Sequence, residues 1–184
     1  AVGFYGDAGN AELTEDSSAR KRDFGYLLCD AWEQSARPVS RQGVRLCLVR
    51  TGIVLGRDGG MLGKLLPVYR LGFGAMLGDG SQWLSWIHID DMVAILVRAV
   101  ETPGIDGVFN ATAPAPVTQR EFHQSLASAV KRPAFLRVPS VALRAGLGEQ
   151  SEILLGGQRV YPRRLEQQGF VFRFPDLKSA LAHQ

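Results

Sequence analysis

The chain has 184 residues, of which 46% are hydrophobic and 21% are charged, a balance typical of one globular domain or slightly more. The formal net charge is only +3, and the lysines and arginines form no basic stripe with interleaved aromatic residues, which argues against nucleic-acid binding. No apolar run is long enough to cross a membrane, and the two cysteines lack metal-ligand spacing, so we expect a cytoplasmic protein without a membrane partner or a bound metal.

The first predicted elements are a strand end, a loop and a helix. The chain begins without a methionine and Ala1–Tyr5 predicts the end of a strand, so we expect further polypeptide before Ala1. Gly6–Arg22 is polar and predicts a loop. Asp23 is placed to cap a helix that continues to about Arg37. The predicted buried stripe of this helix consists of Phe24, Leu27, Leu28, Ala31 and Ser35.

The next segment alternates apolar runs with glycine-rich stretches. Val44–Val49 contains few polar residues and predicts a parallel strand covered on both faces. Thr51–Gly60 predicts a loop, and Met61–Leu71 predicts a helix interrupted by Pro67. Gly72–Gly80 holds four glycines in nine residues and predicts a mobile or ligand-facing loop.

The stretch Gln82–Val97 predicts a strand that leads directly into a helix. The strand is formed by Leu84, Trp86, Ile87 and Ile89. Asp90 or Asp91 is placed as the N-cap of the helix, and His88 lies at the carboxyl end of the strand, the edge at which open α/β sheets bind ligands. The predicted buried face of the helix consists of Met92, Ile95, Leu96 and Ala99.

The rest of the chain continues the alternation of strands and helices, which predicts an α/β fold with parallel pairing. The remaining predicted elements are a strand over Val108–Ala113, a helix over Thr118–Val130 that begins with a capping box, a strand over Phe135–Val138, a helical stretch over Ser140–Leu155, a helix from Pro162 that ends before Gly169, a strand over Phe170–Phe174 and a last helix capped by Asp176.

Familiar catalytic and binding motifs are missing from the sequence. The nearest match to the dinucleotide-binding pattern G-x-G-x-x-G is Gly72-x-Gly74-x-x-x-Gly78, but its last glycine is one residue late and no capped helix follows, so we interpret it as a loop. The sequence contains no G-x-S-x-G nucleophile elbow. The three histidines have no metal-ligand spacing.

Several short motifs nevertheless occur together and in one order. They are Tyr5-Gly6-Asp7, Arg50–Gly56, Asp58-Gly59-Gly60, the Gly72–Gly80 loop, Trp86–Asp91, Gly107–Asn110 and Gly157–Pro162. In this combination the chain resembles the second half of an extended short-chain dehydrogenase/reductase, in the epimerase-like branch that has its own C-terminal extension.

The resemblance implies a division of the chain into two parts. Residues 1–113 would form the C-terminal part of a doubly wound, mostly parallel NAD(P)-binding Rossmann-type domain. Residues 114–184 would form a small α/β extension on the substrate side. Roughly 110 residues, equivalent to two βαβ units, would precede Ala1.

The sequence departs from this family at the residues that carry its chemistry. Extended enzymes use a Tyr-x-x-x-Lys pair as general acid/base, but the aligned positions hold Gly25 and Cys29, which cannot do this work. Tyr26 is one residue away, about 100° around the helix. The arginine that grips the diphosphate in nucleotide-sugar enzymes aligns with Leu84. We therefore assign no catalytic residue from the sequence.

The resemblance also suggests where ligands bind. It places a loop beside the nicotinamide ring, for which a plain connection between strand and helix is the alternative; the loop consists of Thr51, Gly52, Ile53 and Val54. Aromatic side chains with few polar groups suit a small ligand, and the candidates for a substrate cleft are Trp83, Trp86 and His88. Core packing is the alternative for the two tryptophans. Arg50 either faces this cleft or pairs with Asp90.

Two functions remain open at this stage. The first is an NAD(P)-binding epimerase- or dehydratase-like oxidoreductase that acts on a small molecule, with NADP or NAD as cofactor of the intact protein. The second is a dinucleotide-binding protein of the same fold that senses or stores the cofactor without chemistry. In both cases we expect this chain alone to bind the dinucleotide weakly, and we expect a homodimer.

Overall fold

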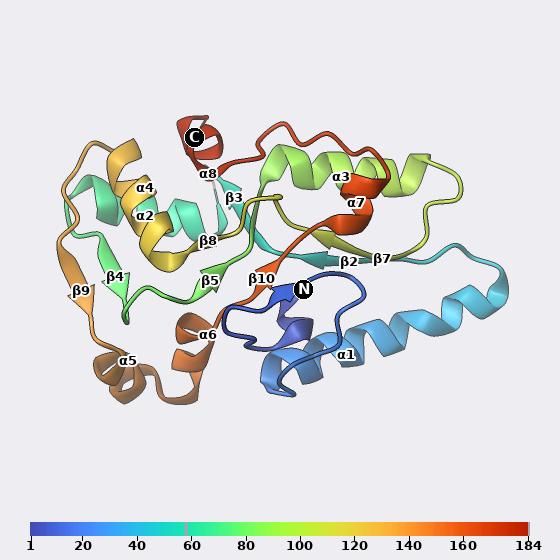
Figure 1. Ribbon diagram of the computed structural model, residues 1–184, viewed down its shortest axis with the longest axis horizontal. Helices are drawn as coiled ribbons and strands as arrows, with labels where there is room; N and C mark the ends of the chain where they lie inside the picture. Colours follow the sequence, from blue (N-terminus) through green and yellow to red (C-terminus); the bar gives the residue numbers. More distant parts are fainter. Residues whose placement is uncertain (58, 184) are drawn as a thin grey trace.

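The computed structural model describes residues 1–57 and 59–183 (Figure 1). Asp58, on which the resemblance partly rests, lies outside the described residues. The helices are η1 (Val2–Tyr5), α1 (Phe24–Ala36), η2 (Arg37–Gln42), α2 (Gly60–Arg70), α3 (Ile89–Glu101), α4 (Gln119–Ala129), α5 (Ser140–Leu147), η3 (Gly148–Gln150), α6 (Ser151–Leu155), α7 (Arg163–Gln167) and α8 (Leu177–Ala182). The strands are β1 (Glu12–Leu13), β2 (Cys47–Thr51), β3 (Ile53–Gly56), β4 (Ala75–Leu77), β5 (Trp83–Leu84), β6 (Trp86–His88), β7 (Gly107–Ala111), β8 (Val117–Thr118), β9 (Leu136–Val138) and β10 (Arg159–Val160).

Parallel strand pairs dominate, and this confirms the predicted α/β fold. β2 pairs with β7 in parallel, from Cys47 opposite Gly107 to Thr51 opposite Ala111. β3 with β6, β1 with β10 and β4 with β9 are also parallel, whereas β5 and β8 are antiparallel. In Figure 1, α3 and α7 lie on one side of the β2–β7 pair and α1 lies on the other, which is the layered arrangement of a Rossmann-type fold.

β2 and β3 form one extended segment that changes partner at Gly52. The Gly52 N–H donates to the Ala111 carbonyl at 3.0 Å, whereas the next N–H, of Ile53, donates to the Ser85 carbonyl at 2.8 Å. A Cβ atom on Gly52 would lie 2.5 Å from that same Ser85 oxygen, so this crossing requires glycine. The predicted loop over Thr51–Gly60 is therefore wrong for Ile53–Gly56, because this segment forms strand β3 and pairs in parallel with β6.

The predicted junction of a strand with a helix is confirmed at β6 and α3, but the predicted strand is split into β5 and β6, Ile89 belongs to the helix, and the cap is different. The N-cap is His88, whose Nδ1 accepts the Asp90 N–H at 3.1 Å. Asp91 is buried and instead accepts the N–H groups of Arg173 and Phe174 at 2.8 and 3.0 Å. The predicted aspartate cap is therefore wrong. The predicted strand over Phe170–Phe174 is also wrong, because backbone N–H groups of this segment donate to the Asp91 carboxylate and not to a neighbouring strand.

The predicted buried faces of two helices also need correction. In α1 the Asp23 cap is confirmed, since its carboxylate accepts the Tyr26 N–H at 3.0 Å. The whole predicted stripe is exposed, however, with Phe24 at 71%, and α1 buries Cys29 and Glu33 instead. In α3, Met92 and Ile95 are buried as predicted, whereas Leu96 is exposed. Apolar periodicity alone did not say which face of these helices would be covered.

α1 packs against the N-terminal segment at Gly3, Gly25 and Cys29. Residues 2–5 form the 3-10 helix η1, so the predicted strand end is wrong. A Cβ atom on Gly25 would lie 3.5 Å from the Gly3 carbonyl oxygen, and one on Gly3 would lie 3.6 Å from the Cys29 sulfur. Both distances are those of ordinary van der Waals contacts, so η1 packs against α1 at these positions without requiring glycine.

The predicted loop over Gly72–Gly80 contains strand β4, so the prediction is wrong at Ala75–Leu77. β9 supplies its partner, which lies far along the sequence. Gly74 packs on the ring of Tyr69, where a Cβ atom would lie 2.6 Å from the ring carbons. The capping box formed by Thr118 and Glu121 and the Asp176 cap of α8 are confirmed. Three further predictions need correction: the predicted loop over Gly6–Arg22 contains strand β1, the strand predicted from Val44 begins at Cys47, and α2 continues through Pro67 without interruption.

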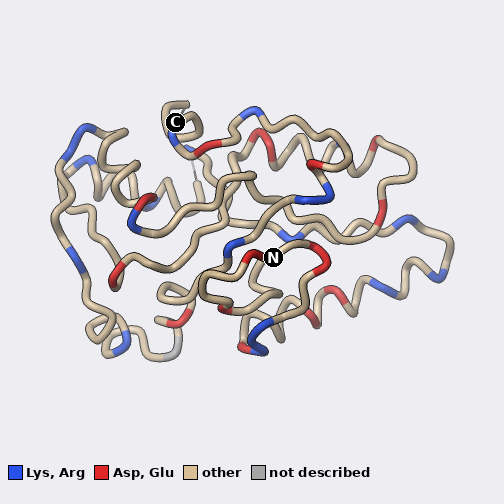
Figure 2. Tube along the Cα trace, in the orientation of Figure 1, with Lys and Arg blue, Asp and Glu red and all other residues tan. Residues whose placement is uncertain are grey.

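Three apolar clusters hold these layers together. The first joins α2, α4, α8, β3 and β6, the second lies between α3, α7 and the β2–β7 pair, and the third joins η1, β1 and β10. Acidic and basic residues are interspersed along the trace (Figure 2). The division between residues 113 and 114 stays a prediction.

Candidate functional site

A buried polar network lies at the carboxyl ends of β2 and β7. Arg50 makes a bidentate ion pair with Glu33, with N–O distances of 2.7 and 2.9 Å. Its Nη1 also donates to the Tyr5 hydroxyl at 3.0 Å, and this hydroxyl donates to Asn110 Oδ1 at 2.8 Å. Arg50 thus pairs with Glu33 and not with Asp90, which corrects one of the two predictions for it. The network joins η1, α1, β2 and β7 at the edge of the sheet where ligands bind.

Burial sets the protonation of this network. It raises the pKa of Tyr5, although Arg50 and Asn110 favour the ionised form. Burial alone lowers the pKa of Arg50, but its hydrogen bonds to Glu33 and Tyr5 outweigh this and the net shift is upward. The phenol is therefore neutral and the guanidinium charged at neutral pH. Because Tyr5 is fully buried, it acts as a structural link and not as a group that touches a ligand.

Glu15 ties the N-terminal loop to the same edge, and the sequence analysis did not single it out. Its Oε1 accepts the N–H groups of Asn110 and Arg164 at 3.0 and 3.4 Å. Its Oε2 is buried and has no hydrogen-bond partner among the described residues. A lone glutamate in a polar loop carries no sequence signal for such a role, because the contacts come from residues about 95 and 149 positions away.

The predicted cofactor residues lie where the chain changes partner. Thr51, Gly52, Ile53 and Val54 are all half-buried at the carboxyl end of β2 and the start of β3. The N–H groups of Gly52 and Ile53 are already bonded to carbonyl oxygens, so a ligand would meet side chains and not these donors. Their contact with nicotinamide stays a prediction.

The three predicted cleft residues lie in different surroundings. Trp86 is only 1% exposed in the first cluster and donates to the Ala115 carbonyl. His88 is buried against the rings of Phe174 and His183. Trp83 is partly exposed and donates from Nε1 to Asn10 at 2.9 Å. Their assignment to a substrate cleft stays a prediction, and Trp83 is the member that remains accessible.

The positions that align with the catalytic tyrosine and lysine serve packing. Gly25 and Cys29 lie against Gly3, as described above, and Cys29 is buried. Gly74, in the weak glycine motif, lies under the Tyr69 ring, and β4 and not a helix follows it. In the part of the chain that the structure describes, this motif is therefore no phosphate cradle.

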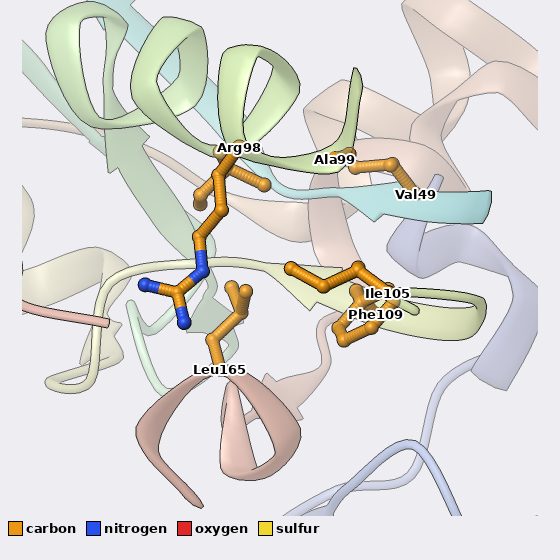
Figure 3. Close-up of a pocket in the computed structure, with 7 residues that line it drawn as sticks. Val49, Arg98, Ala99, Ile105, Phe109 and Leu165 are labelled. Atoms are coloured by element: carbon orange, nitrogen blue, oxygen red, sulfur yellow. The ribbon is translucent and has the colours of Figure 1, made fainter. Parts of the chain in front are cut away.

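Two hollows lie away from this edge. One, below α3, has a volume of about 10 Å³, room for roughly one water molecule, and is lined by apolar side chains and the stem of Arg98 (Figure 3). The other, about 560 Å³ and open, lies at the opposite, amino ends of β2 and β7 beside η2. No group of three or more metal-ligating side chains is close enough to hold a metal among residues 1–57 and 59–183.

A parallel α/β layer with a glycine crossing and a polar network at its carboxyl edge places the chain in the Rossmann-type class of α/β folds. The model of the NAD dependent epimerase/dehydratase family matches residues 9–111, and that of a domain of unknown function, DUF1731, matches residues 138–184. The chain belongs to the NAD dependent epimerase/dehydratase family, in the branch that the sequence resemblance indicated.

Similar proteins agree with this assignment. The chain is 42% identical to an epimerase family protein SDR39U1 homolog of Arabidopsis thaliana, over 98% of this chain and 52% of that protein. It is 44% identical to the epimerase family protein Mb2239 of Mycobacterium bovis, over 100% of this chain and 61% of the relative. The crystal structure of human epimerase family protein SDR39U1 with NADPH superposes with a TM-score of 0.93 at 41% identity, over 100% of this chain and 62% of that one.

The chain therefore spans about half to three fifths of the length of these relatives. A UDP-glucose 4-epimerase from Thermus thermophilus, at 15% identity and a TM-score of 0.68, shows the shared fold alone. In the described residues, no helix has the length and apolar character needed to cross a membrane.

Proposed function

We propose that this chain forms the nicotinamide and substrate side of an NADP(H)-binding oxidoreductase that acts on a small molecule. The observation that carries the proposal is the carboxyl edge itself, where Gly52, the Thr51–Val54 stretch and the buried Arg50 network meet in a family defined by dinucleotide binding. The 41% identical relative crystallised with NADPH supports NADP(H) over NAD(H). The cytoplasmic location and a homodimer are part of this proposal.

The residues present fit one end of the cofactor. The half-buried Thr51–Val54 stretch suits the nicotinamide, whereas the described residues contain no glycine-rich cradle between a strand and a helix for the pyrophosphate. Bound NADP(H) would supply hydride transfer. This chain would position the ring by a backbone that the Arg50 network holds rigid, and Trp83 would contact the substrate.

A non-catalytic role is the second candidate, and one observation favours it. The positions of the usual acid/base pair are occupied by Gly25 and Cys29, which pack against Gly3 and offer no proton. The dinucleotide would then be bound for sensing or storage.

Binding and turnover experiments separate these functions. The protein is expressed from its complete coding sequence, and its affinities for NADPH and NADH are measured by fluorescence titration. We expect tighter binding of NADPH, and oxidation of bound NADPH by a panel of small carbonyl compounds followed at 340 nm. Tight binding without turnover would support the sensing role, whereas no binding of either dinucleotide would refute both.

One variant and one binding measurement test the alignment and the missing pyrophosphate site. Tyr26→Phe should leave turnover within a few-fold, because Tyr26 is out of helical phase for the acid/base position; a loss of about 100-fold or more would contradict this alignment. The chain of residues 1–184 alone should bind NADPH with an affinity far weaker than micromolar, since a pyrophosphate cradle is not among its described residues.

A further inference from the structure

Aromatic rings and guanidinium groups alternate on one side of β10 and the turn that follows it. The Arg159 guanidinium carbon lies 4.5 Å from the centroid of the Trp83 ring and 5.6 Å from that of Tyr161. The Arg163 guanidinium carbon lies 5.1 Å from the Tyr161 centroid. We call these four residues the arginine–aromatic ladder. At these distances a guanidinium is attracted to the aromatic ring by a cation–π interaction, which favours one position of the side chain.

The ladder is anchored to the carboxyl edge of the sheet. The Tyr161 carbonyl accepts the side-chain N–H of Asn110 at 3.0 Å, so it adjoins the Arg50 network. The Val160 N–H donates to the Ser85 hydroxyl at 2.9 Å. The Ser85 carbonyl oxygen is the atom against which the Gly52 backbone packs. The ladder is therefore a neighbour of the proposed nicotinamide-side residues, although it comes from a different part of the chain.

The packing around Trp83 fixes the inner end of the ladder. Its Nε1 is bonded to Asn10, and Gly157 packs so closely on the Trp83 backbone that a Cβ atom there would overlap it. The side chain of Arg159 is 28% exposed, and it forms an ion pair at 3.3 Å with Glu12, whose side chain is 54% exposed. Such exposed pairs contribute little and are readily replaced.

Arg159 also has unused hydrogen-bonding capacity. Its Nε is buried and has no partner within the described residues, whereas a guanidinium carries five N–H donors. Arg163, at the outer end, pairs with Glu166 at 3.2 Å. The buried Nε itself is out of reach of a ligand, so the partly exposed remainder of the guanidinium would make the contact. A cation that lies beside two aromatic rings suits an anion that brings an apolar group with it.

We propose that the arginine–aromatic ladder binds the anionic group of the substrate, a carboxylate or a phosphate on a small organic molecule, with Arg159 as its main contact. This deepens the proposed function, on which it rests, by naming the substrate class. Glu12 pairs with Arg159 in the free protein and releases it to the ligand.

The test uses benzoate and phenyl phosphate as probes, and benzyl alcohol as a neutral analogue, titrated by calorimetry into the protein expressed from its complete coding sequence. We expect binding of the two anions and none of the alcohol, and the tighter of the two anions identifies a carboxylate or a phosphate. Arg159→Gln should weaken anion binding roughly tenfold or more, because a charge-assisted hydrogen bond is lost. Arg159→Lys should retain part of the affinity, since lysine keeps the charge but not the planar fork.

Controls separate this inference from its alternatives. Arg132→Gln removes one exposed positive charge elsewhere, and an equal loss in that variant would reduce the effect to net charge and overturn the proposal. Melting curves show whether Arg159→Gln is folded; if it is not, Glu12→Gln, which frees Arg159, should strengthen anion binding, and no change would overturn the proposal.

NADPH titrations distinguish failure of the anion site from failure of the proposed dinucleotide-dependent function. Unchanged NADPH affinity in Arg159→Gln together with lost anion binding supports the ladder as a substrate site. If Arg159→Gln lost NADPH binding and anion binding equally, Arg159 would be a cofactor contact, and the proposal of a substrate site would be overturned. Anion binding that depends on Arg159 in a protein that binds no dinucleotide would refute the proposed function and leave the ladder as an anion site.

Discussion

The Arg50–Glu33 pair shows how one residue can decide the geometry of the sheet edge. Both side chains are buried, and Arg50 reaches Tyr5 and, through it, Asn110. Removal of one partner leaves the other charge buried without compensation, which costs about 3–5 kcal/mol. The pair is thus less a source of net stability than a device that aligns η1, α1 and β2.

We predict that Glu33→Gln lowers the free energy of unfolding by about 3 kcal/mol or more. Arg37→Gln is the matched control, because Arg37 contacts the same carboxylate at 3.7 Å but is half exposed; it should change the free energy by about 1 kcal/mol or less. Urea denaturation followed by circular dichroism measures both. Equal effects of the two variants would contradict the assignment of Arg50 as the main partner.

His88 makes stability depend on pH. Burial lowers its pKa below the ordinary value of about 6.5, an effect that Asp90 and Asp91 partly offset and that His183 and Arg173 reinforce. Its Nδ1 must also stay unprotonated to accept the Asp90 N–H. The unfolded chain takes up the proton first, so the stabilising contribution is complete above about pH 6.5 and is lost as the pH falls toward the lower, folded pKa.

We therefore predict that the melting temperature falls between pH 7.5 and pH 5.5, and that His88→Asn flattens this slope. Asparagine keeps an N-cap acceptor and does not titrate. Scanning calorimetry at several pH values is the measurement, and an unaltered slope in His88→Asn would show that another group is responsible.

At the scale of the element, one carboxylate takes the place of a strand partner. Asp91 on α3 accepts two successive backbone N–H groups of the segment before α8, and Arg173 adds an ion pair to Asp90 at 3.1 Å. α8 in turn packs on α4 in the first apolar cluster. The C-terminal segment is therefore held by a side chain at one end and by apolar packing at the other.

We predict that Asp91→Ala releases this segment, because two buried N–H groups lose their acceptor. Amide exchange of Arg173 and Phe174 should accelerate strongly, while the amides of β2 and β7 stay protected. Asp90→Ala removes the neighbouring, more exposed carboxylate and serves as the control, with a much smaller effect. Unchanged exchange in Asp91→Ala would mean that packing of α8 alone holds the segment.

The crossing at Gly52 makes a second prediction for an element. Gly52→Ala places a methyl group 2.5 Å from the Ser85 carbonyl oxygen and 3.0 Å from the Thr112 methyl carbon, so β3 must move away from β6. The expected loss of stability is about 1–3 kcal/mol. Gly146→Ala in α5 meets nothing within 4 Å and should be neutral or stabilising. Thermal melts of both variants decide the matter.

At the scale of the whole molecule, two helices expose apolar residues. α3 buries one face against the sheet and exposes a second stripe, which consists of Ile89, Val93, Leu96, Val97 and Val100. α1 exposes Phe24, Leu27 and Trp32. Apolar surface of this extent on a small protein marks a contact surface.

We predict that the chain of residues 1–184 associates in solution, as sedimentation velocity would show by a concentration-dependent rise in sedimentation coefficient. The double variant Val93→Lys, Val97→Lys should reduce this association. Val141→Lys, at an exposed apolar residue of α5, is the control and should not. A monodisperse monomer at all concentrations would contradict the prediction.

Local sequence was sufficient wherever a short-range contact decides the structure. Asp23, Thr118 and Asp176 cap helices within three residues of themselves, and the alternation of strands and helices predicted the parallel α/β fold. The ordered motifs also indicated the family. The contacts that form a helix cap lie within one helical turn, and the α/β alternation follows from local strand and helix patterns repeated along the chain. Both can therefore be predicted from neighbouring residues.

Tertiary structure decided the rest, because the partners lie far apart in sequence. The covered face of α1, the choice of Glu33 for Arg50, and Asp91 as an acceptor for residues 173 and 174 all depend on segments that meet only in the fold. The strands β3 and β4 exist because β6 and β9 supply their hydrogen bonds, although glycine-rich sequence around them predicts loops. A backbone N–H takes whichever acceptor the whole molecule brings to it.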